Sequence, residues 1–255
     1  MRRPVALVTG ARRGIGLGIA KALASKGFDL AITDIAVDNA SESAVETLQN
    51  LGAKVLFVQS DIADLSAHGE AVETVIGALG PINCLVNNAG IGSKVRGDFL
   101  NLDPANYDAI FDVNLRGTVF FTQAVVRAML QDKAVENPRS IINVTSVSAA
   151  MSSPERLDYC MTKAALASFT QGLALRLAQH GISVFDVRPG IIRSDMTAAV
   201  AEKYDKLISE GLVPMKRWGE PDDLGRIAVA LASGDFDFAT GSVINADGAL
   251  SISRL

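Results

Sequence analysis

The stretch that decides the fold is VALVTGARRGIG, residues 5–16, near the start of the chain. Residues 5–8 form an apolar, β-branched run that predicts a short buried strand. Three glycines follow, and residues 15–25 carry apolar side chains at helical spacing. A strand that passes through glycines into a helix can hold phosphate, because the backbone approaches closely and the helix N-terminus presents free N–H groups. We therefore predict a pyrophosphate site here; the alternative is a tight turn without a ligand.

Apolar runs and helical periodicities alternate along the whole chain. This alternation predicts a parallel sheet with right-handed crossovers and helices on both faces, which is an α/β, doubly wound, Rossmann-type fold. We expect one dinucleotide-binding and catalytic domain over residues 1–255, with the irregular stretch 191–218 as a substrate lid within it. Strands are expected at residues 5–8, 30–33, 55–59, 84–86, 140–144, 183–187 and 242–245, and helices at 15–25, 41–51, 65–79, 106–130, 159–179 and 222–232.

The composition narrows the class of protein. Of the 255 residues, 49% are hydrophobic and 20% charged, and the formal net charge is −4. We see no basic stripe of the kind that binds nucleic acid, and no apolar run of about 18 residues that would span a membrane. Cys84 and Cys160 match no metal-ligand spacing and are expected to be reduced thiols, which together with the short apolar run at the N-terminus suggests the cytoplasm. His68 and His180 are too scattered for a metal site and are expected to be solvated helix residues.

An acidic residue ends the second expected strand. Asp34 lies 18 residues after Gly16. A carboxylate there can accept hydrogen bonds from the adenosine ribose, and it would repel a 2′-phosphate. Arg13 argues the other way, because a guanidinium pairs well with a phosphate, unless Arg12 or Arg13 is neutralised by a nearby carboxylate. We expect the carboxylate to face the 2′-position, and hence NAD in preference to NADP.

A tyrosine and a lysine lie four residues apart in a helical pattern. Tyr159 and Lys163 would share a helix face, with Cβ atoms about 5–6 Å apart. An ammonium group beside the phenol favours the phenolate, so we expect Lys163 to lower the pKa of Tyr159 toward the range in which it can exchange protons. The pair alone is weak evidence, because this spacing occurs by chance in many helices. Ser146, which follows the fifth expected strand 13 residues before Tyr159, strengthens it, with Ser148 as a less well spaced competitor.

Taken together, these motifs resemble the short-chain dehydrogenase/reductase family. The first turn has the family's T-G-x-x-x-G-x-G spacing at residues 9–16. Residues 87–90 read N-N-A-G, and residues 189–194 read P-G-I-I-R-S where the family has P-G-x-I-x-T. The resemblance extends to residues 245–248, near the end of the chain.

The resemblance implies a role for each matching residue. Ser146 would hydrogen-bond the substrate carbonyl, Tyr159 would act as general acid and base, and Asn114 and Lys163 would relay the proton. Asp61 would contact the adenine amino group, and Ser194, in place of threonine, would hold the nicotinamide carboxamide. The cofactor-binding residues expected in this way are Gly10, Arg13, Gly14, Ile15, Gly16, Asp34, Asp61, Ile62, Asn88, Ala89, Gly90, Tyr159, Lys163, Pro189, Gly190, Ile192 and Ser194.

The implied activity is hydride transfer between a nicotinamide cofactor and a carbonyl or secondary alcohol. Two alternatives remain open: a 3-oxoacyl-thioester (acyl-carrier-protein) reductase that uses NADPH, and a dinucleotide-binding regulatory protein without catalysis. The expected partner is a small-molecule substrate whose identity the sequence does not give. Residues 151–158 would rim its pocket, with Arg156 either meeting a polar group or, as we prefer here, solvated.

Two of the expected helices carry apolar residues on more than one side. In helices 106–130 and 159–179 these residues are Phe120, Phe121, Val125, Leu166, Phe169 and Leu173. A helix that is apolar all round is usually buried. We expect a homodimer or homotetramer built on these helices, with full burial inside one subunit as the alternative.

Overall fold

A seven-stranded sheet forms the centre of the computed structural model, which describes residues 2–132, 134, 136–198 and 200–254. All of its neighbouring strands pair in parallel, in the order β3-β2-β1-β4-β5-β6-β7. This arrangement confirms the predicted doubly wound α/β fold. The strands are β1 Val5–Thr9, β2 Asp29–Asp34, β3 Val55–Gln59, β4 Ile82–Asn87, β5 Arg139–Val144, β6 Ile182–Pro189 and β7 Val243–Ala246.

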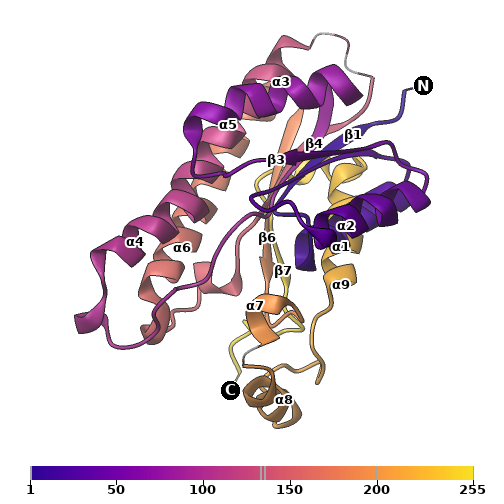
Figure 1. Ribbon diagram of the computed structural model, residues 1–255. Coiled ribbons are helices and arrows are strands. Elements are labelled where there is room, and N and C mark those ends of the chain that lie inside the picture. Colours follow the sequence, from indigo (N-terminus) through magenta and orange to yellow (C-terminus); the bar gives the residue numbers. More distant parts are fainter. Residues whose placement is uncertain (1, 133, 135, 199, 255) are drawn as a thin grey trace.

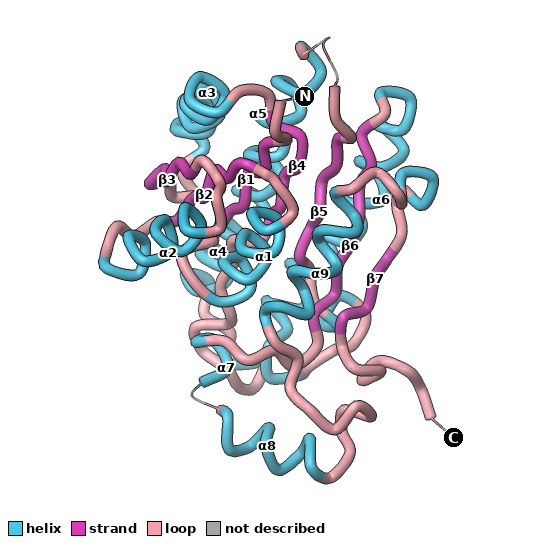
Figure 2. The backbone as a smooth tube through the Cα atoms, turned by 90° about the vertical axis from the view of Figure 1, so that its right-hand side faces the viewer, coloured by secondary structure: helices cyan, strands magenta, loops and turns pink. Residues whose placement is uncertain are grey.

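Helices cover both faces of the sheet (Figures 1 and 2). One face packs on α1, α2 and α9, and the other on α3, α5 and α6. Because side chains alternate along a strand, Ala6 and Val8 of β1 join the first core while Val5 and Leu7 join the second. The helices are α1 Gly14–Ser25, α2 Asn39–Asn50, α3 His68–Leu79, α4 Pro104–Phe111, α5 Thr118–Gln131, α6 Leu157–Leu177, α7 Asp195–Ala198, α8 Ala201–Ser209 and α9 Pro221–Ala232. None of the helices within the described residues is both long and apolar enough to cross a membrane.

Glycines allow α1 and α9 to pack closely. A Cβ atom on Gly18 would lie 2.5 Å from Cβ of Pro221, and one on Gly225 would lie 2.8 Å from Cβ of Ala22. Both distances are too short for real carbon atoms, so α1 and α9 approach more closely than side chains would permit. This contact fixes the first turn of α1 relative to the sheet.

Three local predictions were wrong. The single helix expected at 106–130 is divided, because a π-helical turn, Asp112–Gly117, separates α4 from α5. A Cβ on Gly117 would lie 2.2 Å from the carbonyl oxygen of Ile62, so this turn passes directly against the loop after β3. The stretch 191–218 contains α7 and α8, beyond the carboxyl ends of β6 and β7 (Figure 1). His68 is buried rather than solvated: its Nε2 lies 2.9 Å from the Ile62 carbonyl oxygen.

Candidate active site

A cleft of about 770 Å³ opens at the carboxyl ends of the strands. It lies where the strand order reverses, since β1 pairs with β2 on one side and with β4 on the other. Of the residues predicted to form the site, only Gly16 and Asn114 do not line this cleft. Those that line it are Gly10, Arg13, Gly14, Ile15, Asp34, Asp61, Ile62, Asn88, Ala89, Gly90, Ser146, Tyr159, Lys163, Pro189, Gly190, Ile192 and Ser194.

The first turn presents backbone N–H groups to the cleft. Arg13 is the N-cap of α1, and its side chain makes no cap hydrogen bond, so the first N–H groups of the helix have no partner from a capping side chain. Asn88 holds the turn in place: its Nδ2 donates to the carbonyl oxygens of Thr9 and Gly10, each at 2.9 Å. A Cβ on Gly16 would lie 2.4 Å from the Gly10 carbonyl oxygen, so the close packing within this turn requires a glycine at position 16. These features suit a pyrophosphate group.

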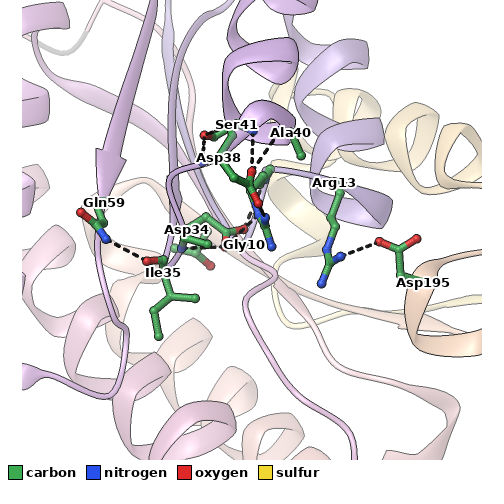
Figure 3. A network of polar contacts seen from close by, with 12 residues as sticks. Gly10, Arg13, Asp34, Ile35, Asp38, Ala40, Ser41, Gln59 and Asp195 are labelled. Carbon is green, nitrogen blue, oxygen red and sulfur yellow. Dashed lines mark hydrogen bonds and ion pairs between the residues drawn. The ribbon is translucent and has the colours of Figure 1, made fainter.

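The arginine beside Asp34 is Arg12 rather than Arg13, and Figure 3 shows Arg13 directed toward Asp195. Arg12 Nε lies 3.5 Å from Asp34 Oδ1, and the same guanidinium is ion-paired with Asp38. Arg13 points elsewhere, with one guanidinium nitrogen 3.0 Å from Asp195 Oδ2 at the start of α7. Each arginine thus has a carboxylate partner, which is the alternative that the sequence analysis left open for Arg12 and Arg13.

Tyr159, Ser146 and Lys163 meet in the cleft. Tyr159 and Lys163 lie on α6, with Lys163 Nζ 5.7 Å from the centre of the tyrosine ring. Burial raises the pKa of Tyr159, while the neighbouring Ser146 hydroxyl and the charge of Arg156 act in the opposite direction. The expected lowering of the pKa by Lys163 is wrong, because burial outweighs the charges around the phenol. The contact with Ser146 favours it over Ser148 as the hydroxyl that faces the substrate.

Lys163 is a buried cation. Its Nζ donates a hydrogen bond to the Val144 carbonyl oxygen at 3.1 Å, and only 5% of the residue is exposed. Burial lowers the pKa of Lys163 to about 8, and the negative charge of Asp186 raises it in part. The lysine is therefore held where it can share or release a proton near neutral pH.

A buried acidic group behind Lys163 was missed from the sequence. Asp186 of β6 accepts a hydrogen bond from the Thr145 hydroxyl and forms an ion pair of 2.8 Å with Arg188 Nε. Only 1% of Asp186 is exposed. An aspartate between the apolar residues Phe185 and Val187 of a strand was the available signal, since carboxylates are almost never fully buried without a partner.

Asn114 supports the site without lining the cleft. It lies in the π-helical turn, where its Oδ1 accepts a hydrogen bond from the Ile91 N–H at 2.8 Å. Its Nδ2 donates to the Ile91 carbonyl at 2.9 Å and lies 3.3 Å from the Thr162 hydroxyl. The amide thus ties the loop after β4 to α6, which carries Tyr159.

The loop after β6 closes the far side of the cleft. Ser194 lines it, and its backbone N–H donates to the Thr197 hydroxyl at 3.0 Å. Thr197, which the sequence analysis did not single out, also donates to the Ile192 carbonyl at 2.8 Å and so sets the shape of the loop. Gly190 lies against Asp247, where a Cβ would come within 2.8 Å of that residue's Cα.

The cleft, the glycine turn and the tyrosine–lysine pair define a nicotinamide-dependent oxidoreductase, and the chain belongs to the short-chain dehydrogenase/reductase family. A family model described as enoyl-(acyl carrier protein) reductase matches residues 10–251. The chain thus acts on CH–OH or carbonyl groups with a nicotinamide cofactor, and the resemblance drawn from its motifs is confirmed.

Particular relatives differ in the substrate that their names give. The chain is 34% identical to the 3-oxoacyl-(acyl-carrier-protein) reductase of Staphylococcus epidermidis, over 96% of this chain and 98% of that enzyme. It is 35% identical to galactitol 2-dehydrogenase of Agrobacterium fabrum, over 97% of each chain. A crystal structure described as 3-oxoacyl-(acyl-carrier protein) reductase from Brucella melitensis in complex with NAD superimposes with a TM-score of 0.97 at 64% identity, over the full length of both chains.

Proposed function

We propose that the protein is an NAD-dependent dehydrogenase or reductase in which Tyr159 exchanges the proton of the substrate oxygen. The observation that carries the proposal is the convergence of the Tyr159 phenol, the Ser146 hydroxyl and buried Lys163 in the cleft. The bound nicotinamide would supply or accept the hydride. The protein's own residues would bind the substrate oxygen and move its proton.

The proton steps follow from the positions of these side chains. When a carbonyl is reduced, Ser146 and Tyr159 would both donate hydrogen bonds to its oxygen, and Tyr159 would then give up its proton. Because burial raises the pKa of this phenol, the phenol is the stable form and is ready to donate. Lys163 would stabilise the resulting phenolate through its positive charge. Because burial lowers the pKa of Lys163 to about 8, the ammonium group could also pass on a proton near neutral pH. Asn114 would contribute to the proton relay indirectly, because its amide holds the loop at Ile91 in place beside the site.

The dinucleotide would lie across the first turn, with its adenosine end at Asp34 and Asp61. Support for NAD comes from Asp34, whose carboxylate lines the cleft and whose neighbour Arg12 is already paired. The Brucella relative was crystallised with NAD, which agrees with this proposal. Residues 87–90 and 189–194 would complete the cofactor site, with Ser194 at the carboxamide.

We assign residues 191–218 to a substrate lid within the single domain. Met196, Tyr204 and Leu212 from this stretch line the cleft, and the ion pair between Arg13 and Asp195 joins it to the cofactor turn. A small hydrophobic cluster of Ile208, Val213 and Trp218 gives the stretch a packed interior of its own. Such a segment can cover a bound substrate as a unit.

A homotetramer or homodimer in the cytoplasm completes the proposal. Phe121, Val125 and Leu166 are buried within the subunit, whereas Phe120 on α5 remains 42% exposed and Leu175 on α6 84% exposed. Exposed apolar groups on these two helices favour a subunit contact there. Both cysteines are free thiols, which agrees with a reducing compartment.

A second candidate activity is the reduction of 3-oxoacyl thioesters, favoured by the names of the Brucella and Staphylococcus relatives. The test measures consumption of NADH and NADPH with simple ketones, ketoses, oxo acids and a 3-oxoacyl thioester. Turnover of at least one carbonyl with NADH supports the proposal. Turnover of the thioester alone, with NADPH, would favour the second candidate. Dinucleotide binding without turnover of any substrate would favour a regulatory protein.

A further inference from the structure

Arg156 lines the cleft close to Tyr159. The lining also contains apolar or neutral residues such as Met151, Ser152, Leu212 and Leu250. Arg156 is half-buried and belongs to the short turn that precedes α6. The sequence analysis preferred a solvated arginine here; the structure places the residue at the lining of the cleft.

Among the described residues, the Arg156 guanidinium lies over an aromatic ring, that of Tyr159, and differs from the other cations of the cleft because it has no carboxylate or carbonyl partner. Arg12 is paired with Asp34 and Asp38, Arg13 with Asp195, and Lys163 donates to the Val144 carbonyl. Within residues 2–132, 134, 136–198 and 200–254, the side chain of Arg156 forms neither an ion pair nor a hydrogen bond, and only its backbone N–H donates, to the Ser153 carbonyl at 3.0 Å. A guanidinium that is partly withdrawn from water loses hydration, and an anionic ligand can replace it.

The position of Arg156 restricts where such an anion can lie. The central carbon of its guanidinium is 5.4 Å from the centre of the Tyr159 ring. The substrate oxygen must contact the hydroxyl of the same tyrosine. An anionic group that reaches Arg156 would therefore be only a few bonds from the carbon that is oxidised or reduced.

We propose that Arg156 binds a carboxylate of the substrate, so that the enzyme interconverts small oxo acids and hydroxy acids. This inference rests on the proposed dehydrogenase function and names its substrate class. A planar guanidinium accepts a carboxylate through two parallel hydrogen bonds, which would also orient the carbonyl toward Tyr159 and Ser146. The charge of Arg156 has a second effect, because it lowers the pKa of Tyr159 against the influence of burial.

The test compares each acid with its neutral ester. We would measure kcat/KM with NADH for acetoacetate and levulinate and for their methyl esters, in wild type, Arg156→Gln and Arg156→Lys. Arg127→Gln is the matched control, because it removes the same charge from an exposed position on α5 outside the cleft. Changes in the pKa of Tyr159 affect acid and ester alike, so the ratio of the two kcat/KM values isolates carboxylate binding.

Wild type is expected to prefer at least one acid over its ester, and Arg156→Gln to reduce that preference by about 10- to 100-fold. Arg156→Lys should retain part of it and Arg127→Gln all of it. Thermal unfolding and NADH titration of each variant identify any loss of fold. Turnover of the esters with an unchanged ratio in Arg156→Gln would overturn the inference alone. Absence of turnover with the entire panel of carbonyls would contradict the proposed function itself.

Discussion

Replacement of Asp34 by asparagine tests how the cofactor is selected. The carboxylate lines the cleft, its side chain is 13% exposed, and its nearest cation is Arg12 at 3.5 Å. Asparagine keeps the shape and removes the charge that would face a 2′-phosphate. We expect NADPH to be used more efficiently and NADH less efficiently.

The size of the change follows from two contributions. One pair of unit charges about 5 Å apart interacts by about 3 kcal/mol at an effective dielectric constant of about 20. Loss of a charged hydrogen bond to the ribose costs about 1.5–3 kcal/mol. Solvent at the cleft mouth screens these interactions, and we take about half of their sum, near 2.5 kcal/mol. This free energy corresponds to a shift of about 70-fold in the ratio of kcat/KM with NADPH to kcat/KM with NADH.

The assay is kcat/KM for each dinucleotide with one carbonyl substrate. Asp38→Asn is the matched control, because Asp38 also pairs with Arg12 but does not line the cleft, and asparagine can still cap α2. Its cofactor ratio should change little. A wild-type preference for NADPH, or an unchanged ratio in Asp34→Asn, would refute the reasoning.

Two further predictions concern the glycine turn and the buried lysine. Gly16→Ala should abolish NADH binding in a fluorescence titration, because the new Cβ would lie 2.4 Å from the Gly10 oxygen, whereas Gly77→Ala in α3, with nothing within 4 Å, should bind normally. Retained binding in Gly16→Ala would show that the turn tolerates a side chain. Lys163 has a folded pKa of about 8 against an ordinary 10.5, so the unfolded chain binds the proton more strongly and stability should rise with pH between these values. In denaturant unfolding, the free energy of unfolding should rise with pH by up to about 3 kcal/mol in wild type, and this rise should be absent in Lys163→Met. Asp186→Asn should move the onset of the rise to lower pH. An identical rise in Lys163→Met would show that other groups cause it.

The sheet was predictable because its strands are apolar runs that alternate with segments of helical periodicity. Each of the seven expected strands is present, and the turn at residues 9–16 lies where its glycines placed it. The motif residues were also brought together as expected, because the carboxyl ends of parallel strands meet at one edge.

The features that were missed depend on contacts between distant segments. The π-helical turn arises where Gly117 meets the Ile62 carbonyl, and helical periodicity carries no sign of that meeting. The pairing of Arg12 with Asp34, and of Arg13 with Asp195, depends on where each side chain points after folding. The raised pKa of Tyr159 reflects burial, which the spacing of Tyr159 and Lys163 does not reveal.

The phenolic hydroxyl of Tyr159 is the central element of the proposed mechanism, and Tyr159→Phe removes that group while keeping the ring. The decisive measurement combines steady-state turnover of a carbonyl substrate with the NADH dissociation constant of the same variant. We predict that turnover falls by at least about 100-fold while the dissociation constant stays near that of wild type. Turnover at the wild-type rate in Tyr159→Phe would contradict the account.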